Sequence, residues 1–168
     1  MPVAKEPGAR VIGVTGGEHK AAVARELGAD VVIDRTAQDF VSVVKEVTDG
    51  RGADVVYDSV GGESYDRSTK CIAFEGRILV VGFASGQIPR PGLNHALVKN
   101  YSIVGLHWGL YATKDPQSLR DAHAELLKLA AAGTIKPLVS ERLGLADVAD
   151  GLERLAAGQT TGRLTFQP

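Results

Sequence analysis

The sequence predicts an α/β fold in which the strands of a doubly wound parallel sheet alternate with helices. Short runs of β-branched residues without polar alternation, such as Val31–Ile33, are typical of strands buried on both faces of a parallel sheet. Segments of about ten residues with apolar side chains at helical spacing lie between these runs. Because glycine-containing turns separate the two kinds of segment, the chain is expected to consist of βαβ units.

In the first part of the chain, polar and glycine residues mark the ends of helices. Gly28 follows a helical pattern and is expected to act as its C-cap. Thr36 is followed three positions later by Asp39, a weak capping box that predicts a helix beginning at Thr36, with Phe40 and Val44 on its apolar face. The expected elements are the end of a helix over Met1–Gly8, the strand Ala9–Val14, the helix Glu18–Leu27, the strand Val31–Ile33, the helix from Thr36 and the strand Asp54–Tyr57.

The second part of the chain continues the alternation. Asp115 supplies an acceptor at an N-cap and Pro116 suits the first helical position, so a helix is expected to begin there and to end before Gly133. The other expected elements are the helix Glu63–Ala73, the strand Arg77–Val81, a short helix Leu93–Val98, the strand Ser102–Leu106, the strand Leu138–Arg142, the helix Ala146–Ala157 and the strand Arg163–Phe166.

Composition excludes several classes of function. With 168 residues the chain is long enough for a packed core, and a net charge of −1 without a basic cluster argues against nucleic acid or an anionic membrane as partner. The start has no apolar run of the signal-peptide kind, and no run is long enough to span a bilayer, so a cytoplasmic protein is expected. A single cysteine, Cys71, excludes an internal disulfide and a multi-cysteine zinc site.

The α/β pattern lacks one part that a nucleotide-binding domain is expected to have. Such a domain opens with a strand that runs into a glycine-rich turn, whose backbone N–H groups receive the pyrophosphate of the cofactor. No G-x-G-x-x-G spacing occurs in this chain. The sequence is therefore expected to be part of an enzyme rather than a whole one.

Four sequence blocks resemble one enzyme superfamily. In chain order they read GARVIGVTGGEHKAAVARELGADVVID, GADVVYDSVGG, GRILVVGFASG and KNYSIVGLHWGLY. They are similar to consecutive blocks of the medium-chain dehydrogenase/reductases, and most of all to the zinc-independent NADPH:quinone oxidoreductase branch. The resemblance covers Pro2–Pro168 and implies a Rossmann-type domain, NADP as cofactor, and hydride transfer to a small-molecule quinone or enone without a metal.

The resemblance also implies what surrounds this segment in a complete member of the family. Such a member is about twice as long and begins with a GroES-like catalytic domain, followed by the first strand and the glycine-rich turn of the Rossmann-type sheet. Val3–Gly8 corresponds to the end of the helix after that turn. We therefore expect a truncated protein, with a partial dinucleotide-binding domain at residues 1–134. Residues 135–168 are expected to form a segment that, in the family, returns to the catalytic domain.

The missing first strand has a predicted energetic cost, because that strand is central in the doubly wound order. Without it, the strands at Val11 and Val31 separate from those at Val55, Leu79 and Ile103. An unsatisfied buried backbone group costs roughly 1–3 kcal/mol, against a total stability of about 5–15 kcal/mol. The two C-terminal strands are also expected to lose their partners, which predicts a marginal fold that is prone to aggregation unless another chain completes it.

Two basic residues favour NADP over NAD. A complete NAD-preferring domain has an acidic residue at the end of its second strand. The corresponding strand of this chain is Ala9–Val14, and no carboxylate occurs between Val14 and Gly17. Lys20 matches the lysine that the family uses for the 2′-phosphate. Arg35 falls where relatives often have a tyrosine near the same phosphate, and an arginine binds phosphate bidentately. Each residue alone is better explained as a solvated charge, and it is the two together that favour NADP.

Three further segments are expected near the cofactor, because ligands of open α/β sheets bind at the carboxyl ends of the strands. The first segment is also explained by an ordinary strand-to-helix turn, and the second by an ordinary structural turn. For His107, in the third segment, packing is the alternative role. No catalytic residue is assigned, since the resemblance implies that such reductases act mainly by holding the nicotinamide near the acceptor. The candidate cofactor-binding residues in these segments are Val60 and Gly61, then Gly82, Phe83 and Ser85, and finally His107 and Trp108; Arg163, near the C-terminus, matches a basic residue that reaches the NADP phosphates in the family.

The strand Tyr101–Leu106 is expected at the edge of the sheet, where the family commonly pairs two subunits. Its apolar sequence has no lysine or proline to protect the edge, which favours a homodimer. Two functions remain open. The chain is either the cofactor-binding half of an NADPH-dependent quinone or enone reductase, or a non-catalytic remnant that binds a nucleotide or dimerises. Independent activity of this segment is not expected.

Overall fold

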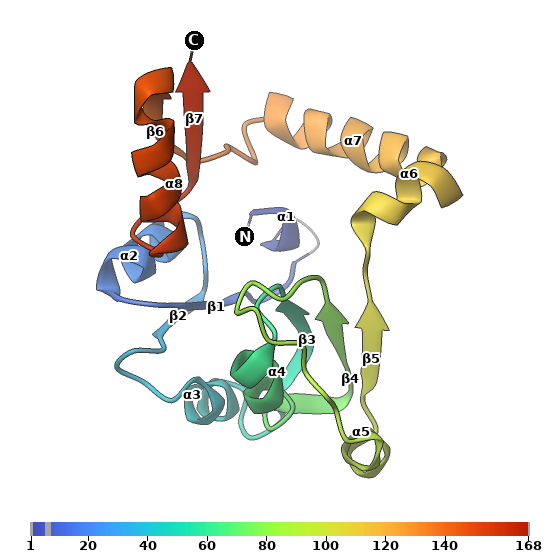
Figure 1. Cartoon of the computed structure of the whole chain (residues 1–168). Coiled ribbons are helices and arrows are strands. Elements are labelled where there is room, and N and C mark those ends of the chain that lie inside the picture. Colours follow the sequence, from blue (N-terminus) through green and yellow to red (C-terminus); the bar gives the residue numbers. More distant parts are fainter. Residues whose placement is uncertain (1, 6–7, 168) are drawn as a thin grey trace. The chain divides into compact units, whose positions relative to one another are not determined.

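The computed structural model describes residues 2–5 and 8–167, so the helix end expected over Met1–Gly8 lies partly outside the described residues. Helices and strands alternate along the chain (Figure 1). Short 3₁₀ turns occupy Trp108–Leu110 and Leu145–Asp147. In order, the elements are α1 (Pro2–Lys5), β1 (Ile12–Thr15), α2 (Glu18–Glu26), β2 (Val31–Asp34), α3 (Phe40–Val47), β3 (Ala53–Asp58), α4 (Gly62–Ser68), β4 (Ile72–Val80), α5 (Leu93–Lys99), β5 (Ser102–Gly105), α6 (Tyr111–Lys114), α7 (Pro116–Ala131), β6 (Val139–Gly144), α8 (Val148–Ala156) and β7 (Arg163–Gln167).

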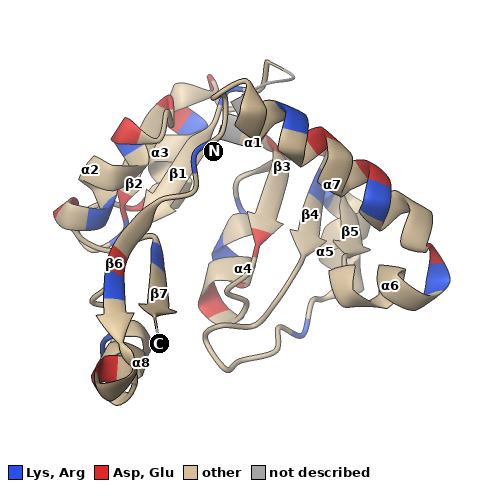
Figure 2. Ribbon diagram, turned by 90° about the horizontal axis from the view of Figure 1, so that it is seen from above, with Lys and Arg blue, Asp and Glu red and all other residues tan. Residues whose placement is uncertain are grey.

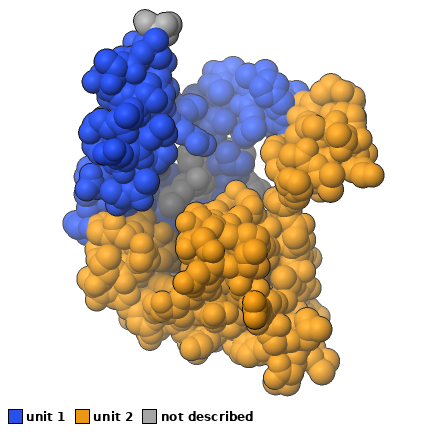
Figure 3. Space-filling view, in the orientation of Figure 1, with its two compact units in different colours: residues 1–13, 18–32, 122–168 blue, residues 14–17, 33–121 orange. Residues whose placement is uncertain are grey.

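The chain divides into two compact units (Figure 3). The central unit consists of Val14–Gly17 and Ile33–Asp121. The terminal unit consists of Met1–Gly13, Glu18–Val32 and Ala122–Pro168. Each unit is described by itself below.

The described strands form three separate sheets, with the orders β1-β2, β3-β4-β5 and β6-β7. The predicted separation is confirmed, because β1 and β2 are not hydrogen-bonded to the sheet of β3, β4 and β5. The pairs β3–β4, β4–β5 and β6–β7 are parallel, as the α/β pattern requires. One expectation is wrong: β6 and β7 do not lack partners, because they pair with each other, with Leu143 opposite Phe166.

The core of the central unit lies around β4. Ile78 is fully buried and is paired with Val56 on β3 and Ile103 on β5. Tyr65 of α4 and Tyr101, just before β5, are buried in the same cluster. Because its hydroxyl is withdrawn from water, the pKa of Tyr65 is raised to about 12. Burial of these apolar side chains stabilises the central unit.

The helix α3 begins at Phe40 rather than at Thr36, which corrects the sequence prediction. Its N-cap is Asp39, whose carboxylate accepts hydrogen bonds from the N–H groups of Val41 and Ser42. Thr36 lies in the preceding turn, where its N–H and its hydroxyl both donate to Asp34 Oδ1. The acidic residue expected inside the helix is therefore the cap itself.

The helix α4 ends at Ser68, and residues expected to prolong it belong to β4. Ala53 N–H donates to the carbonyl of Cys71 at 2.8 Å, and Ala53 pairs with Ile72. This approach depends on Gly52 (φ +90°), because a Cβ there would lie 2.6 Å from the Cys71 carbonyl oxygen. Tertiary pairing with β3 thus overrides the local helical pattern.

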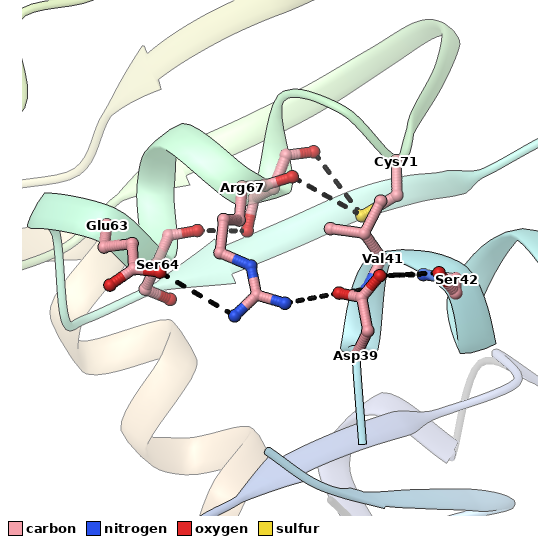
Figure 4. Close-up of polar contacts among 8 residues, drawn as sticks. Asp39, Val41, Ser42, Glu63, Ser64, Arg67 and Cys71 are labelled. Carbon is pink, nitrogen blue, oxygen red and sulfur yellow. Dashed lines mark hydrogen bonds and ion pairs between the residues drawn. The ribbon is translucent and has the colours of Figure 1, made fainter. Parts of the chain in front are cut away.

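An arginine links α3 to α4 (Figure 4). The Arg67 guanidinium forms an ion pair with Asp39 and lies 4.6 Å from the centroid of the Phe40 ring. Its other contact, with Glu63, is longer, at 3.9 Å. Hydrogen bonds from the Ser42 hydroxyl and from Arg67 lower the pKa of Asp39 to about 2. The N-cap of α3 therefore stays charged at neutral pH.

The terminal unit has few buried side chains. The helix α8 approaches β6 closely at Gly151, where a Cβ would lie 2.8 Å from Leu143 Cδ1. Arg154 of α8 reaches Glu141 of β6 at 2.9 Å and Asp150 at 2.9 Å. Acidic and basic residues are interspersed along the helices (Figure 2). Among the described residues, no helix is both long and apolar enough to cross a membrane.

Candidate functional site

A cleft of about 690 Å³ lies in the central unit, at the carboxyl ends of β4 and β5. Residues 80–83 line it from β4 and the segment that follows, and residues 105–107 line it from the end of β5. Leu110, Tyr111, Lys114 and Asp115 complete the lining. Because the two strands are parallel, their carboxyl ends meet at one edge of the sheet, which is where open α/β sheets bind ligands.

The cleft brings together three of the predicted cofactor-binding residues: Gly82, Phe83 and His107. The loop that contains Gly82, Phe83 and Ser85 is hydrogen-bonded to the loop that contains Val60 and Gly61. The bonds run from Val81 N–H to the Asp58 carbonyl (2.9 Å), from Ala84 N–H to Ser59 (3.1 Å), from Ser85 N–H to Val60 (3.0 Å) and from Gly62 N–H to Gln87 (3.0 Å). The two predicted segments thus form one double loop.

Gly61 is required for this loop pairing. Its φ is +71°, and a Cβ there would lie 2.8 Å from the Gln87 carbonyl oxygen and 2.9 Å from Phe83 Cδ1. Gly61 is buried beneath these groups, whereas Val60 is 42% exposed. The Ser85 hydroxyl accepts a hydrogen bond from Gln87 N–H at 3.2 Å. Gly61 therefore shapes the loop, and Val60 is the residue of this turn that solvent reaches.

Asp58 is a buried carboxylate that the sequence prediction left out of the site. It ends β3 and is only 4% exposed. Its Oδ1 accepts hydrogen bonds from the N–H groups of Val60 and Gly61, both at 3.0 Å. Its Oδ2 is buried and has no hydrogen-bond partner among the described residues. The sequence shows an acidic residue directly before a Ser-Val-Gly-Gly turn, but the burial of this residue depends on the neighbouring strands.

The segment after β5 presents aromatic and basic side chains at the cleft. The imidazole of His107 is exposed and lies beside Gly109, with Nε2 3.5 Å from the position of a Cβ on that glycine. Trp108 does not line the cleft but stacks on Tyr111, with ring centroids 5.2 Å apart and planes at 37°. The sequence prediction missed Tyr111 and Lys114, because the short helix α6 that carries them has no distinct apolar pattern.

Arg35 lies beside the turn that follows β1. Its guanidinium packs against Gly16, with Nη2 3.1 Å from the position of a Cβ on that glycine. The adjacent Asp34 also faces this turn, and its Oδ1 accepts from Gly17 N–H at 2.8 Å. Hydrogen bonds from the Thr36 hydroxyl, then from Gly17 and Thr36 N–H, hold the pKa of Asp34 below its usual value. The turn thus has an arginine and a carboxylate, although Val14–Gly17 itself contains no acidic residue.

The other two predicted phosphate ligands belong to the terminal unit. Lys20 is half-buried on α2, and its Nζ lies 3.6 Å from the position of a Cβ on Gly158, just after α8. Arg163 begins β7 with its side chain exposed, and its N–H donates to the Leu138 carbonyl at 2.8 Å. Both cations are accessible to an anion. No group of three or more His, Cys, Asp or Glu side chains among the described residues is arranged to hold a metal ion.

Residues 1–128 match the family described as zinc-binding dehydrogenase, and the chain belongs to that family. It is 41% identical over 160 residues to the quinone oxidoreductase-like protein 2 homolog of Nematostella vectensis, covering 95% of this chain and 44% of the relative. The Escherichia coli quinone oxidoreductase in complex with NADPH is 32% identical with a TM-score of 0.90, covering 99% of this chain and 52% of that one. Within the medium-chain dehydrogenase/reductase superfamily, the chain corresponds to the C-terminal half of the proteins of the quinone oxidoreductase branch.

The substrates named for these relatives vary. A 2-haloacrylate reductase of Burkholderia is 30% identical over 176 residues, covering all of this chain and 51% of the relative. The chain spans about half the length of the curated relatives that it matches. Although the family is named for zinc, the side chains that the structure describes do not form a zinc site.

Proposed function

We propose that this chain is the NADPH-binding half of a reductase that transfers hydride to a quinone or an enone. The observation that carries the proposal is the cleft at the carboxyl ends of β4 and β5. Its volume of about 690 Å³ is within the usual range for small-molecule sites, and its lining is mostly apolar. A solved relative of the same fold contains NADPH, which supports the choice of cofactor.

Arg35 is the proposed ligand of the cofactor's 2′-phosphate. Its guanidinium lies against Gly16 at the end of β1, and the part of the chain that the structure describes has no ion pair to it. Asp34, on the same turn, already accepts three hydrogen bonds at Oδ1. These hydrogen bonds hold the Asp34 carboxylate against the turn. Lys20 and Arg163 keep the phosphate-binding role that the family resemblance implies.

The double loop and the segment after β5 are proposed to frame the nicotinamide. Gly82 and Phe83 line the cleft from the segment after β4, and His107 lines it from the segment after β5. Ser85 and Val60 lie at the exposed rim of the double loop. When bound, NADPH supplies the hydride. These residues hold the reacting groups in contact, so the rate depends on proximity rather than on an acid or a base in this chain.

A calorimetric titration with NADPH and NADH tests this function. The purified chain is expected to bind NADPH more tightly than NADH. Arg35→Gln is expected to weaken NADPH binding about tenfold, or about 1.4 kcal/mol, and to leave NADH binding unchanged. Arg120→Gln, an exposed arginine on α7 of the same unit, is the matched control. Equal affinity for the two cofactors, or an equal loss for both in Arg35→Gln, contradicts the proposal.

We further propose a homodimer through β5. Among the described strands it pairs with β4 alone, at the edge of its sheet, and Val104 is 40% exposed on it. An unpaired apolar edge is a template for a strand of a second copy. Sedimentation of the purified chain is expected to give twice the monomer mass, and a monomer at all concentrations would exclude this interface.

A non-catalytic nucleotide-binding module is the second candidate. It is favoured by the division of the described strands into separate sheets, which leaves β1–β2 unpaired with β3–β4–β5. The two candidates differ in turnover and agree in NADPH binding. Loss of NADPH absorbance with a quinone acceptor supports the reductase, and tight NADPH binding without this loss supports the module.

A further inference from the structure

The two formally charged residues that line the cleft differ in what their charges already contact. Asp115 caps α7, where its Oδ1 accepts from Ser118 N–H at 3.2 Å and its Oδ2 from the Ser118 hydroxyl at 2.6 Å. The hydroxyl contact is the main reason why the pKa of this carboxyl lies below its usual value. The Asp115 charge is therefore engaged by the start of its own helix.

Lys114 is not engaged in this way. It is the last residue of α6 and is exposed, and no hydrogen bond or ion pair joins its ammonium to any residue that the structure describes. Although it is next to Asp115 in the chain, the pair forms no salt bridge. Most other side chains of the cleft are apolar, among them Leu106 and Tyr111. The cleft thus combines an apolar surface with the Lys114 ammonium, which has no partner among the described residues, and the capped carboxylate of Asp115.

We propose that this cleft selects acceptors that carry an acidic group, with Lys114 holding that group. The inference rests on the proposed function, because it assumes that the acceptor enters the cleft. A planar apolar body would lie against Leu110 and Tyr111, and a carboxylate on it would reach the ammonium. The match of one charge to an otherwise apolar pocket is the usual source of orientation in small-molecule sites. Lys114 is therefore a specificity-determining residue.

A pair of isosteric probes isolates the charge. The carboxylate probe is 2-naphthoate and its neutral counterpart is 2-naphthamide, and calorimetry measures the binding of each to the purified chain. An exposed ion pair contributes little, so the expected preference for 2-naphthoate is about threefold. Lys114→Gln is expected to remove the preference and Lys114→Arg to keep it. Lys128→Gln, on α7 and paired with Glu125, is the control expected to behave as the wild type.

Titrating the same variants with NADPH separates the inference from the proposed function. Unchanged NADPH binding in Lys114→Gln, with loss of the naphthoate preference, supports an acceptor site. If Lys114→Gln weakens NADPH binding and leaves the probe preference intact, Lys114 serves the cofactor and the inference is wrong. Equal binding of the two probes to the wild type, or binding of neither, also overturns it. If the wild type binds no NADPH, the proposed function itself fails.

Discussion

The central and terminal units differ in how much apolar surface they bury. In the central unit, large side chains such as Ile33, Tyr65 and Ile78 are at most 1% exposed. In the terminal unit, the buried hydrophobic residues among those described are two alanines of α2, Ala21 and Ala24. Leucines of the terminal unit remain open to solvent; they include Leu127 (57%), Leu145 (65%), Leu152 (53%) and Leu155 (53%).

This difference indicates that the candidate site belongs to the unit with the larger hydrophobic core. The free energy gained by burying apolar area scales with that area, so the central unit has a core of its own and the terminal unit has little. The cleft and the double loop belong to the unit with the core. A site that must hold two reacting groups in contact benefits from such a rigid support.

Truncating one apolar residue of each unit gives the largest expected contrast. Ile78→Ala removes a fully buried side chain from the central strand of its sheet and is expected to cost about 2–5 kcal/mol of unfolding free energy. Leu155→Ala, at a position 53% exposed on α8, is expected to cost less than about 1 kcal/mol. Urea denaturation measures both, and similar losses in the two variants would remove the distinction between the units.

A matched pair of glycine substitutions sharpens the comparison within the central unit. Gly61 and Gly86 both have a positive φ, +71° and +75°. A Cβ at Gly61 would meet a backbone oxygen at 2.8 Å and a ring carbon at 2.9 Å, whereas a Cβ at Gly86 would meet nothing within 4 Å. Both alanine variants are strained by the positive φ, and Gly61, with a ψ of −160°, lies in a backbone region that is essentially restricted to glycine. Gly61→Ala is expected to lose roughly 1–3 kcal/mol more through overpacking. Equal melting temperatures of the two variants would mean that the double loop accommodates a side chain at residue 61 without loss of stability.

The smallest expected effect is a pH dependence at the cap of α3. The folded-state pKa of Asp39 is about 2, below its ordinary value of 3.8, so the stabilisation is present above pH 4 and is lost as the pH falls through 2. In Asp39→Asn the loss of stability over this interval is expected to be smaller than in the wild type. Thermal unfolding at a series of pH values measures the difference, and parallel profiles would show that the carboxylate is not held by Ser42 and Arg67.

Local patterns in the sequence predicted the elements whose ends are set by local chemistry. The start of α7 at Pro116 and its end before Gly133 follow from capping and turn residues, and the structure confirms both. Ile72 and Ala73 could not be placed from the sequence, because their strand conformation comes from pairing with β3. A helix as short as α6 has too few residues to show the apolar periodicity that predicts a helix.

The candidate site likewise has parts that the sequence predicts and parts that it does not. The glycine-containing loops after β3 and β4 were predictable, because turns at strand ends have a clear composition. The buried state of Asp58 and the approach of Asp34 to Gly17 depend on strands being neighbours, which the sequence does not reveal. Lys114 lines the cleft because α6 lies near the carboxyl ends of β4 and β5, which the sequence does not reveal either.

Hydrogen–deuterium exchange of the whole chain, with and without NADPH, tests most directly whether the unit with the core is the unit that binds the cofactor. We expect amides of β4 to exchange more slowly than those of β6 and β7, because the opening of a packed core costs more free energy. NADPH is expected to slow exchange further at residues 82–86 and 105–109. Equally fast exchange in the two units, or NADPH protection that spares both of these segments, would contradict the account.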